Sequence, residues 1–165
     1  MKTIKSLAVL AIVCVVITLN SCKKKDAQPA YSITATVDGK ATSFNTNAKA
    51  VTASLQGATL TTIMGQASDG TTISILLNAA PTVGKTYTSG SADPNSQPVL
   101  QLSTLSDSFL NDDSSSNLVT VTVNSVSSSS IQGTFKGDLA SISIGSSQPV
   151  TKSITNGTFN VPYSK

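Results

Sequence analysis

One short stretch of this chain gathers several side chains that could hold a metal ion, namely Asp107, Asn111, Asp112 and Asp113. Carboxylate and amide oxygens are the ligands that calcium takes, about six to eight at a time. The stretch lacks the spacing and the closing glutamate of an EF-hand loop. An acidic loop that keeps neighbouring strands soluble explains the same residues. We therefore expect a solvated loop here, with a calcium site as the alternative.

Composition argues against most catalytic chemistries. The chain contains no histidine, so it cannot form a Ser-His-Asp triad, a Cys-His pair or a histidine zinc site. Its two cysteines, Cys14 and Cys22, both lie near the amino terminus. Two aspartates could still act as the acid and base of a glycosidase. Most of the aspartates, however, adjoin Gly, Ser or Pro, as they do in turns. We expect no catalytic residues and no cofactor.

Cys22 is the other residue with distinctive chemistry. Lys2 and Lys5 precede an apolar run over residues 7–19, and Cys22 follows it directly ahead of three lysines. A charged start and a short apolar run indicate a secretory signal, because a membrane-spanning helix needs about 20 apolar residues. Cys14 lies inside the run and is lost with it. An exported chain with one leftover thiol would be anomalous, and attachment of a lipid to Cys22 removes the anomaly.

The four residues Leu19-Asn20-Ser21-Cys22 resemble the lipobox of bacterial lipoproteins, although Asn20 departs from the usual small residue. With the Lys/Asp cluster that follows, the junction looks like those of lipoproteins of the Bacteroidota. This resemblance implies diacylglycerol on the Cys22 sulfur, cleavage before Cys22 and acylation of the new amino terminus. Several acyl chains hold a protein durably at a membrane. The expected location is the cell envelope, at the outer membrane, with the exposed face left open.

The chain is therefore expected to have three parts: a signal peptide over residues 1–21, a lipid-anchored polar tether over residues 22–30 and one domain over residues 31–165. From residue 31 onward the chain contains six lysines and seven aspartates, so the net charge of the domain is close to zero. It has no basic patch with interleaved aromatic residues, and we expect no nucleic-acid partner. It also has no cysteine for a disulfide, so packing and backbone pairing must stabilise it.

Alternation of apolar and polar residues shows which elements must position any site. Tyr31, Ile33, Ala35 and Val37 alternate with polar residues, and the turn pair Asp38-Gly39 follows at once. Helical periodicity is absent. We expect an all-β fold, a single antiparallel β-sandwich or partly open β-barrel of about nine or ten short strands. The clearest strand patterns cover residues 31–37, 51–55, 60–67, 71–77, 100–102, 119–123, 131–139 and 154–161, and exposed loops are expected over residues 89–98 and 107–117.

A Gly-Thr-Phe sequence occurs twice, at residues 133–135 and 157–159. Two copies are too few for a repeat array, and we interpret them as neighbouring strands of one sheet. The surrounding sequences, residues 133–139 and 154–162, resemble uncharacterised small lipoproteins of the Bacteroidota, with the C-terminal pattern N-G-x-F-N-V-P. The resemblance implies a lipid-anchored β domain at the envelope and supplies no activity. We expect Phe135 and Phe159 in the core.

Two functional classes stay open. The first is a binding or structural module that presents its loops to an unidentified protein or glycan. The second is a carrier that holds a small apolar molecule inside a β-barrel. A carrier needs a large enclosed apolar cavity, whereas a sandwich has a filled core. An enzyme would need two aspartates in one cleft, about 5 to 9.5 Å apart.

Overall fold

The computed structural model describes residues 31–142 and 149–165 of the chain. These residues form strands and one short 3₁₀ turn, so the predicted all-β class is confirmed, with eleven strands in place of the nine or ten expected. No helix in these two ranges is long and apolar enough to cross a membrane. The elements are β1 (Ser32–Val37), β2 (Lys40–Ser43), β3 (Thr46–Leu55), β4 (Ala58–Gln66), β5 (Thr72–Leu77), β6 (Thr86–Thr88), η1 (Pro94–Ser96), β7 (Pro98–Ser103), β8 (Ser108–Asn111), β9 (Thr120–Val126), β10 (Ser130–Ser141) and β11 (Thr151–Ser164).

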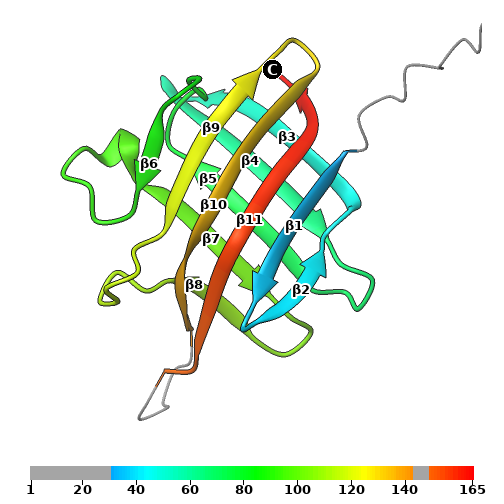
Figure 1. Ribbon diagram of the computed structural model, residues 1–165. Coiled ribbons are helices and arrows are strands. Elements are labelled where there is room, and N and C mark those ends of the chain that lie inside the picture. Colours follow the sequence, from blue (N-terminus) through cyan, green and yellow to red (C-terminus); the bar gives the residue numbers. More distant parts are fainter. Residues whose placement is uncertain (1–30, 143–148) are drawn as a thin grey trace, which may run out of the picture.

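The strands form one sheet that closes into a ring. Its order is β2-β1-β11-β3-β4-β5-β7-β8-β10-β9-β6, and β10 also pairs with β11. The sheet folds into two layers that cross each other in Figure 1, with β2, β1, β11, β10 and β9 in front and β3, β4, β5, β7 and β8 behind. The sheet passes between the layers at β8–β10 and at β11–β3. We call the first group, together with β6, the front layer and the second group the rear layer.

Tight turns set the register of the hairpins. Asp38 and Gly39 join β1 to β2 and both have positive φ, 47° and 80°. Gln56 and Gly57 join β3 to β4 with φ of 50° and 85°. Two consecutive residues with positive φ are typical of the type I′ turn, whose twist matches that of antiparallel strands. The predicted turn at Asp38-Gly39 is therefore confirmed.

The core lies between the two layers and is filled by side chains. Phe44, Tyr87, Phe109, Phe135 and Phe159 are each at most 4% exposed, and aliphatic residues from both layers surround them. The predicted burial of Phe135 and Phe159 is confirmed. Because these aromatic side chains occupy the interior, the closed sheet packs like a sandwich rather than surrounding an open lumen.

The repeated Gly-Thr-Phe sequence is explained by strand pairing, as predicted. In the antiparallel pair β10–β11, Gly133 lies opposite Phe159 and Phe135 lies opposite Gly157. Each ring covers the glycine of the neighbouring strand, and the two rings are stacked with centroids 6.5 Å apart. A Cβ at Gly133 would collide with the ring of Phe159. The two copies are thus a reciprocal packing unit between adjacent strands.

The closure between β11 and β3 is short and is reinforced by side chains. Only two residue pairs join these strands, Tyr163 with Ala50 and Ser164 with Val51, and they are parallel. The Thr52 hydroxyl group bonds both the Tyr163 hydroxyl at 2.8 Å and the Thr61 hydroxyl at 2.7 Å. Side-chain hydrogen bonds therefore supplement a backbone ladder of only two residue pairs.

The expectation of an irregular exposed loop over residues 107–117 is wrong for its first half. Ser108–Asn111 forms β8, and Phe109 within it is 4% exposed. The strand is too short to show alternation in the sequence, and it forms because β7 pairs with one of its edges and β10 with the other. The loop predicted over residues 89–98 is likewise too long, since Ser89 is 2% exposed and Pro98 begins β7.

Candidate functional site

The structure does not bring the four candidate calcium ligands together. Asp107 precedes β8 and Asp112 follows it, so their backbones are about 16 Å apart along an extended strand. Calcium ligands lie about 2.3 to 2.6 Å from one ion. The Asp107 carboxylate accepts a hydrogen bond from Ser106 at 2.6 Å, and the Asp112 carboxylate accepts one from the Ser114 amide at 3.1 Å. No group of three acidic or other metal-binding side chains gathers anywhere in the described ranges.

Asn111, the amide of that candidate set, has a structural role instead. Its Oδ1 accepts a hydrogen bond from the Leu100 amide at 2.8 Å, and its Nδ2 donates one to the Pro98 carbonyl at 2.7 Å. Backbone pairing between β7 and β8 is limited to Leu102–Phe109 and Ser103–Ser108. The Asn111 side chain therefore takes the place of a backbone partner where β8 turns away to pair with β10.

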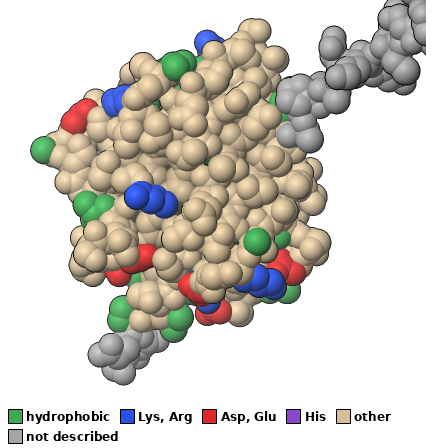
Figure 2. Space-filling view, viewed as in Figure 1, with side chains coloured by type: hydrophobic (Ala, Val, Ile, Leu, Met, Phe, Trp, Pro, Cys, Tyr) green, Lys and Arg blue, Asp and Glu red, His purple; other side chains and the backbone are tan. Residues whose placement is uncertain are grey.

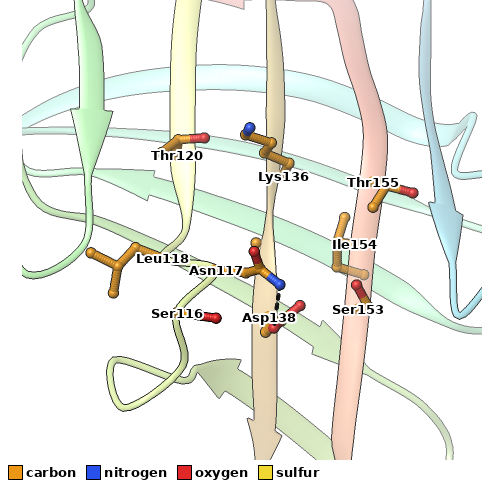
Figure 3. Close-up of a pocket in the computed structure, with 10 residues that line it drawn as sticks. Ser116, Asn117, Leu118, Thr120, Lys136, Asp138, Ser153, Ile154 and Thr155 are labelled. Atoms are coloured by element: carbon orange, nitrogen blue, oxygen red, sulfur yellow. Dashed lines mark hydrogen bonds between the residues drawn. The ribbon is translucent and has the colours of Figure 1, made fainter.

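A groove on the outside of the front layer is the best-formed candidate site. Two adjoining depressions, each of about 430 Å³, share Thr120 of β9 and Lys136 of β10. Figure 3 shows the first of them, with Asp138 in its centre and Ser153 and Thr155 of β11 beside it. Five of its ten lining residues carry hydroxyl or amide side chains, Leu118 and Ile154 add apolar surface, and Lys136 and Asp138 are its cation and its carboxylate.

Backbone irregularities in β10 and β11 shape this groove. The register of β10 against β11 shifts between Phe135 and Gly137. Gly137 has φ of 143°, and a Cβ there would lie 2.5 Å from the Val119 Cα, so only glycine allows this approach. On the facing strand Asn156 has φ of 51°. Bulges of this kind bend the strand and re-aim its side chains, and they are over-represented next to functional sites.

Asp138 is the best-anchored polar residue of the groove. Ser115 Oγ and Asn117 Nδ2 both donate to Asp138 Oδ2, at 2.7 Å and 3.1 Å. The bond from Ser115 is the main cause that lowers the pKa of Asp138; partial burial opposes it, and bonds from Asn117 and Ser153 add to the lowering. Asp138 is therefore ionised at neutral pH, and its position is fixed by the loop before β9.

A row of hydroxyl residues crosses the same face. The strand register places one Ser or Thr of each front-layer strand opposite the next, from β2 at one edge to β6 at the other. Thr34 and Thr158 are hydrogen-bonded at 2.9 Å, as are Thr86 and Thr122. We call this set the hydroxyl row. Its members are Ser43, Thr34, Thr158, Thr134, Thr122 and Thr86.

The front face that carries the hydroxyl row is largely uncharged. Figure 2 shows it mostly in the colour of backbone and uncharged polar side chains, with a basic side chain near the middle and hydrophobic, basic and acidic side chains towards the rim. Thr134 and Thr158 of the row are exposed and also line the second depression of the groove. The row and the groove therefore form one continuous surface.

Sequence reasoning did not find this site. The signal that could have pointed to it is the Thr-x-Thr pattern of residues 34–36, 86–88 and 120–122, which places two threonines on one face of each strand. What the pattern cannot give is the register between strands far apart in the chain. Asp138 lies within residues 133–139, where the repeated Gly-Thr-Phe is the visible pattern and nothing singles out the carboxylate.

The residue with the strongest sequence signal, Cys22, lies outside the described residues, as do the expected signal peptide and tether. Within the described ranges, the candidate site is thus the groove with the hydroxyl row beside it. Comparison of the chain with protein-family models, with curated proteins and with solved structures found no match.

Proposed function

We propose that this chain is a lipid-anchored protein of the bacterial cell envelope, and that its β domain works by binding rather than by catalysis. The observation that carries the proposal is the order of elements at the amino terminus: lysines, an apolar run, and Cys22 at the end of a lipobox-like junction. Export followed by lipidation accounts for this order and for a single cysteine after the apolar run.

The domain's geometry supports a binding role. Buried side chains, among them Tyr87, Phe44 and Phe159, occupy its interior, which favours a filled core over the enclosed cavity that a carrier would need. The main depressions on the described part of the chain, the groove among them, are open to solvent. The groove that centres on Asp138 holds one carboxylate, whereas acid–base catalysis on a glycoside uses two.

The anchor is tested by cell fractionation of two single variants. With Cys22→Ala we expect the protein to leave the membrane fraction or to accumulate as the uncleaved precursor, because the lipid acceptor is gone. Cys14→Ala is the matched control, since it removes the other cysteine and leaves the junction intact. Unchanged partitioning of Cys22→Ala with membranes, at the size of the mature chain, would contradict the proposal.

A further inference from the structure

We propose that the groove and the hydroxyl row bind an extended, neutral glycan chain that lies across the strands of the front layer. This inference adds a ligand class to the binding role proposed above. It rests on the spacing, the hydrogen-bonding capacity and the charge of the surface.

The spacing of the hydroxyl row suits a chain of β-1,4-linked hexoses. Adjacent strands lie about 4.8 Å apart, so the backbone positions of the six row residues repeat at about that distance and the row is about 24 Å long. Two neighbouring hydroxyl pairs within it are drawn together to 2.9 Å by their hydrogen bonds. The backbone repeat is close to the advance of one hexose residue along an extended β-1,4-linked chain. A bound chain therefore places one sugar opposite each strand.

The twist of the sheet selects a single flexible chain. Neighbouring strands are rotated by about 20 to 25°, so the hydroxyl row turns gradually across the face. The rotatable linkages of an oligosaccharide can follow such a turn. The flat surface of a crystalline glycan cannot follow it.

The threonine pairs retain hydrogen-bonding capacity for a ligand. In the pair Thr34–Thr158, one hydroxyl group donates to the other at 2.9 Å. The second hydroxyl proton and three of the four lone pairs stay free to bond sugar hydroxyl groups. Thr86 and Thr122 form an equivalent pair, so two arrays of donors and acceptors flank Thr134.

Asp138 and Lys136 supply the directional contacts of the groove. Ser115 and Asn117 both donate to Asp138 Oδ2. Each carboxylate oxygen has two lone pairs, so even with the bond from Ser153, Oδ1 can accept from a ligand hydroxyl group. Lys136 is exposed on the same strand, two residues away and on the same face. One positive and one negative charge beside an uncharged row favour a neutral partner over an anionic one.

Isothermal titration of the full mature chain, in a detergent without a sugar headgroup, tests the proposal. The probes are cello-oligosaccharides and β-1,4-manno-oligosaccharides of two to six residues, with maltohexaose and dextran sulfate for comparison. We expect one of the β-1,4 series to bind, with affinity that rises with length up to six residues and exceeds that of maltohexaose and dextran sulfate. The proposal is overturned if neither series binds at millimolar concentration, or if dextran sulfate binds more tightly.

Two variants locate the binding. Thr122→Val/Thr134→Val removes two hydroxyl groups while keeping strand-forming side chains, and we expect the dissociation constant to rise at least about tenfold. Thr72→Val, on the exposed face of the rear layer, is the matched control and should bind as the parent does. Equal binding by all three proteins would place the ligand elsewhere and overturn the proposal. Because fractionation of Cys22→Ala reads the anchor alone, a failure of glycan binding is distinguishable from a failure of the anchor.

Discussion

At the scale of single residues, the molecule depends on a few side chains whose partners are far away in the chain. Asp138 of β10 holds the loop before β9 through Ser115 and Asn117. The backbone supports the same contact, since the Asp138 amide donates to the Asn117 carbonyl and the Asp112 amide donates to the Asp138 carbonyl. Gly133 and Phe159 are a second such pair. Each of these contacts leads to a testable prediction about the stability of the fold.

The contribution of Asp138 to stability should depend on pH. Its pKa is lower in the folded chain than its ordinary value of 3.8, chiefly because Ser115 donates to the ionised form. The stabilisation is therefore complete well above pH 3.8 and is lost as the pH falls through the folded-state pKa. We expect Asp138→Asn to lower the free energy of unfolding by about 1 kcal/mol at pH 7.

Urea unfolding of the parent and of Asp138→Asn at pH 7 and at pH 3 measures this difference. It should shrink at the lower pH, which lies below the ordinary value of 3.8, because protonation of the carboxyl in the unfolded chain then offsets the stabilisation. Asp113→Asn, at an exposed position of the same loop, is the control and should be close to neutral. A difference that stays constant with pH would show that the charge of Asp138 does not stabilise the fold.

Substitution of Gly133 should be more damaging than its small change in volume suggests. A Cβ at this position collides with the Phe159 ring and with the Thr122 carbonyl oxygen, which belongs to the backbone and cannot move freely. We expect Gly133→Ala to cost about 1 to 3 kcal/mol of unfolding free energy. Gly57→Asn is the control, because Gly57 has open space around it and asparagine tolerates its positive φ. Thermal melting that ranks the two variants the other way would contradict the reciprocal packing.

At the scale of the elements, the short strand β8 joins the two layers. It pairs with β7 of the rear layer and with β10 of the front layer. Because the pairing with β7 ends after two residue pairs, the side chain of Asn111 completes the hydrogen bonding of Leu100 and Pro98. The residue that looked like a metal ligand in the sequence is thus part of the joint between layers.

Asn111→Ala should weaken this joint. It leaves the amide of Leu100, a residue with no exposed surface, without its acceptor, and an unsatisfied buried donor costs about 1 to 3 kcal/mol. Amide hydrogen exchange should show faster exchange at Leu100 and in β8, with smaller changes in β3. Asn124→Ala, on an exposed position of β9, is the comparison. Loss of Asn111 without faster exchange at Leu100 would mean that other groups hold the joint.

The sequence predicts the long strands because alternation and turn pairs are local signals. Asp38-Gly39 and the segments that become β4, β5 and β10 are examples. It does not predict β6 and β8, which are three and four residues long and exist through their partners. The groove is hidden for the same reason, because Thr34 and Thr158 are neighbours only through a pairing that spans most of the chain.

At the scale of the whole molecule, the proposed anchor and the groove lie at different places on the domain. The start of β1 and the end of β11 lie at the same end in Figure 1, and Ser32 pairs with Asn160. Ser153, which lines the groove, lies seven residues earlier along β11, about 23 Å from that end. The part of the groove around Ser153 therefore lies away from the end at which a tether before β1 would attach, whereas Thr34 of the hydroxyl row lies two residues from Ser32.

The most direct test of the account is the mass of the amino-terminal peptide of the protein purified from membranes. We predict a peptide that begins at Cys22 and carries diacylglycerol on the sulfur with a further acyl group on the amino terminus. Mild alkaline hydrolysis should remove the mass of the two ester-linked acyl chains and leave the thioether-linked glycerol and the amide-linked acyl group in place. An unmodified Cys22, or a mature chain that begins elsewhere, would contradict the lipid anchor on which the proposed function depends.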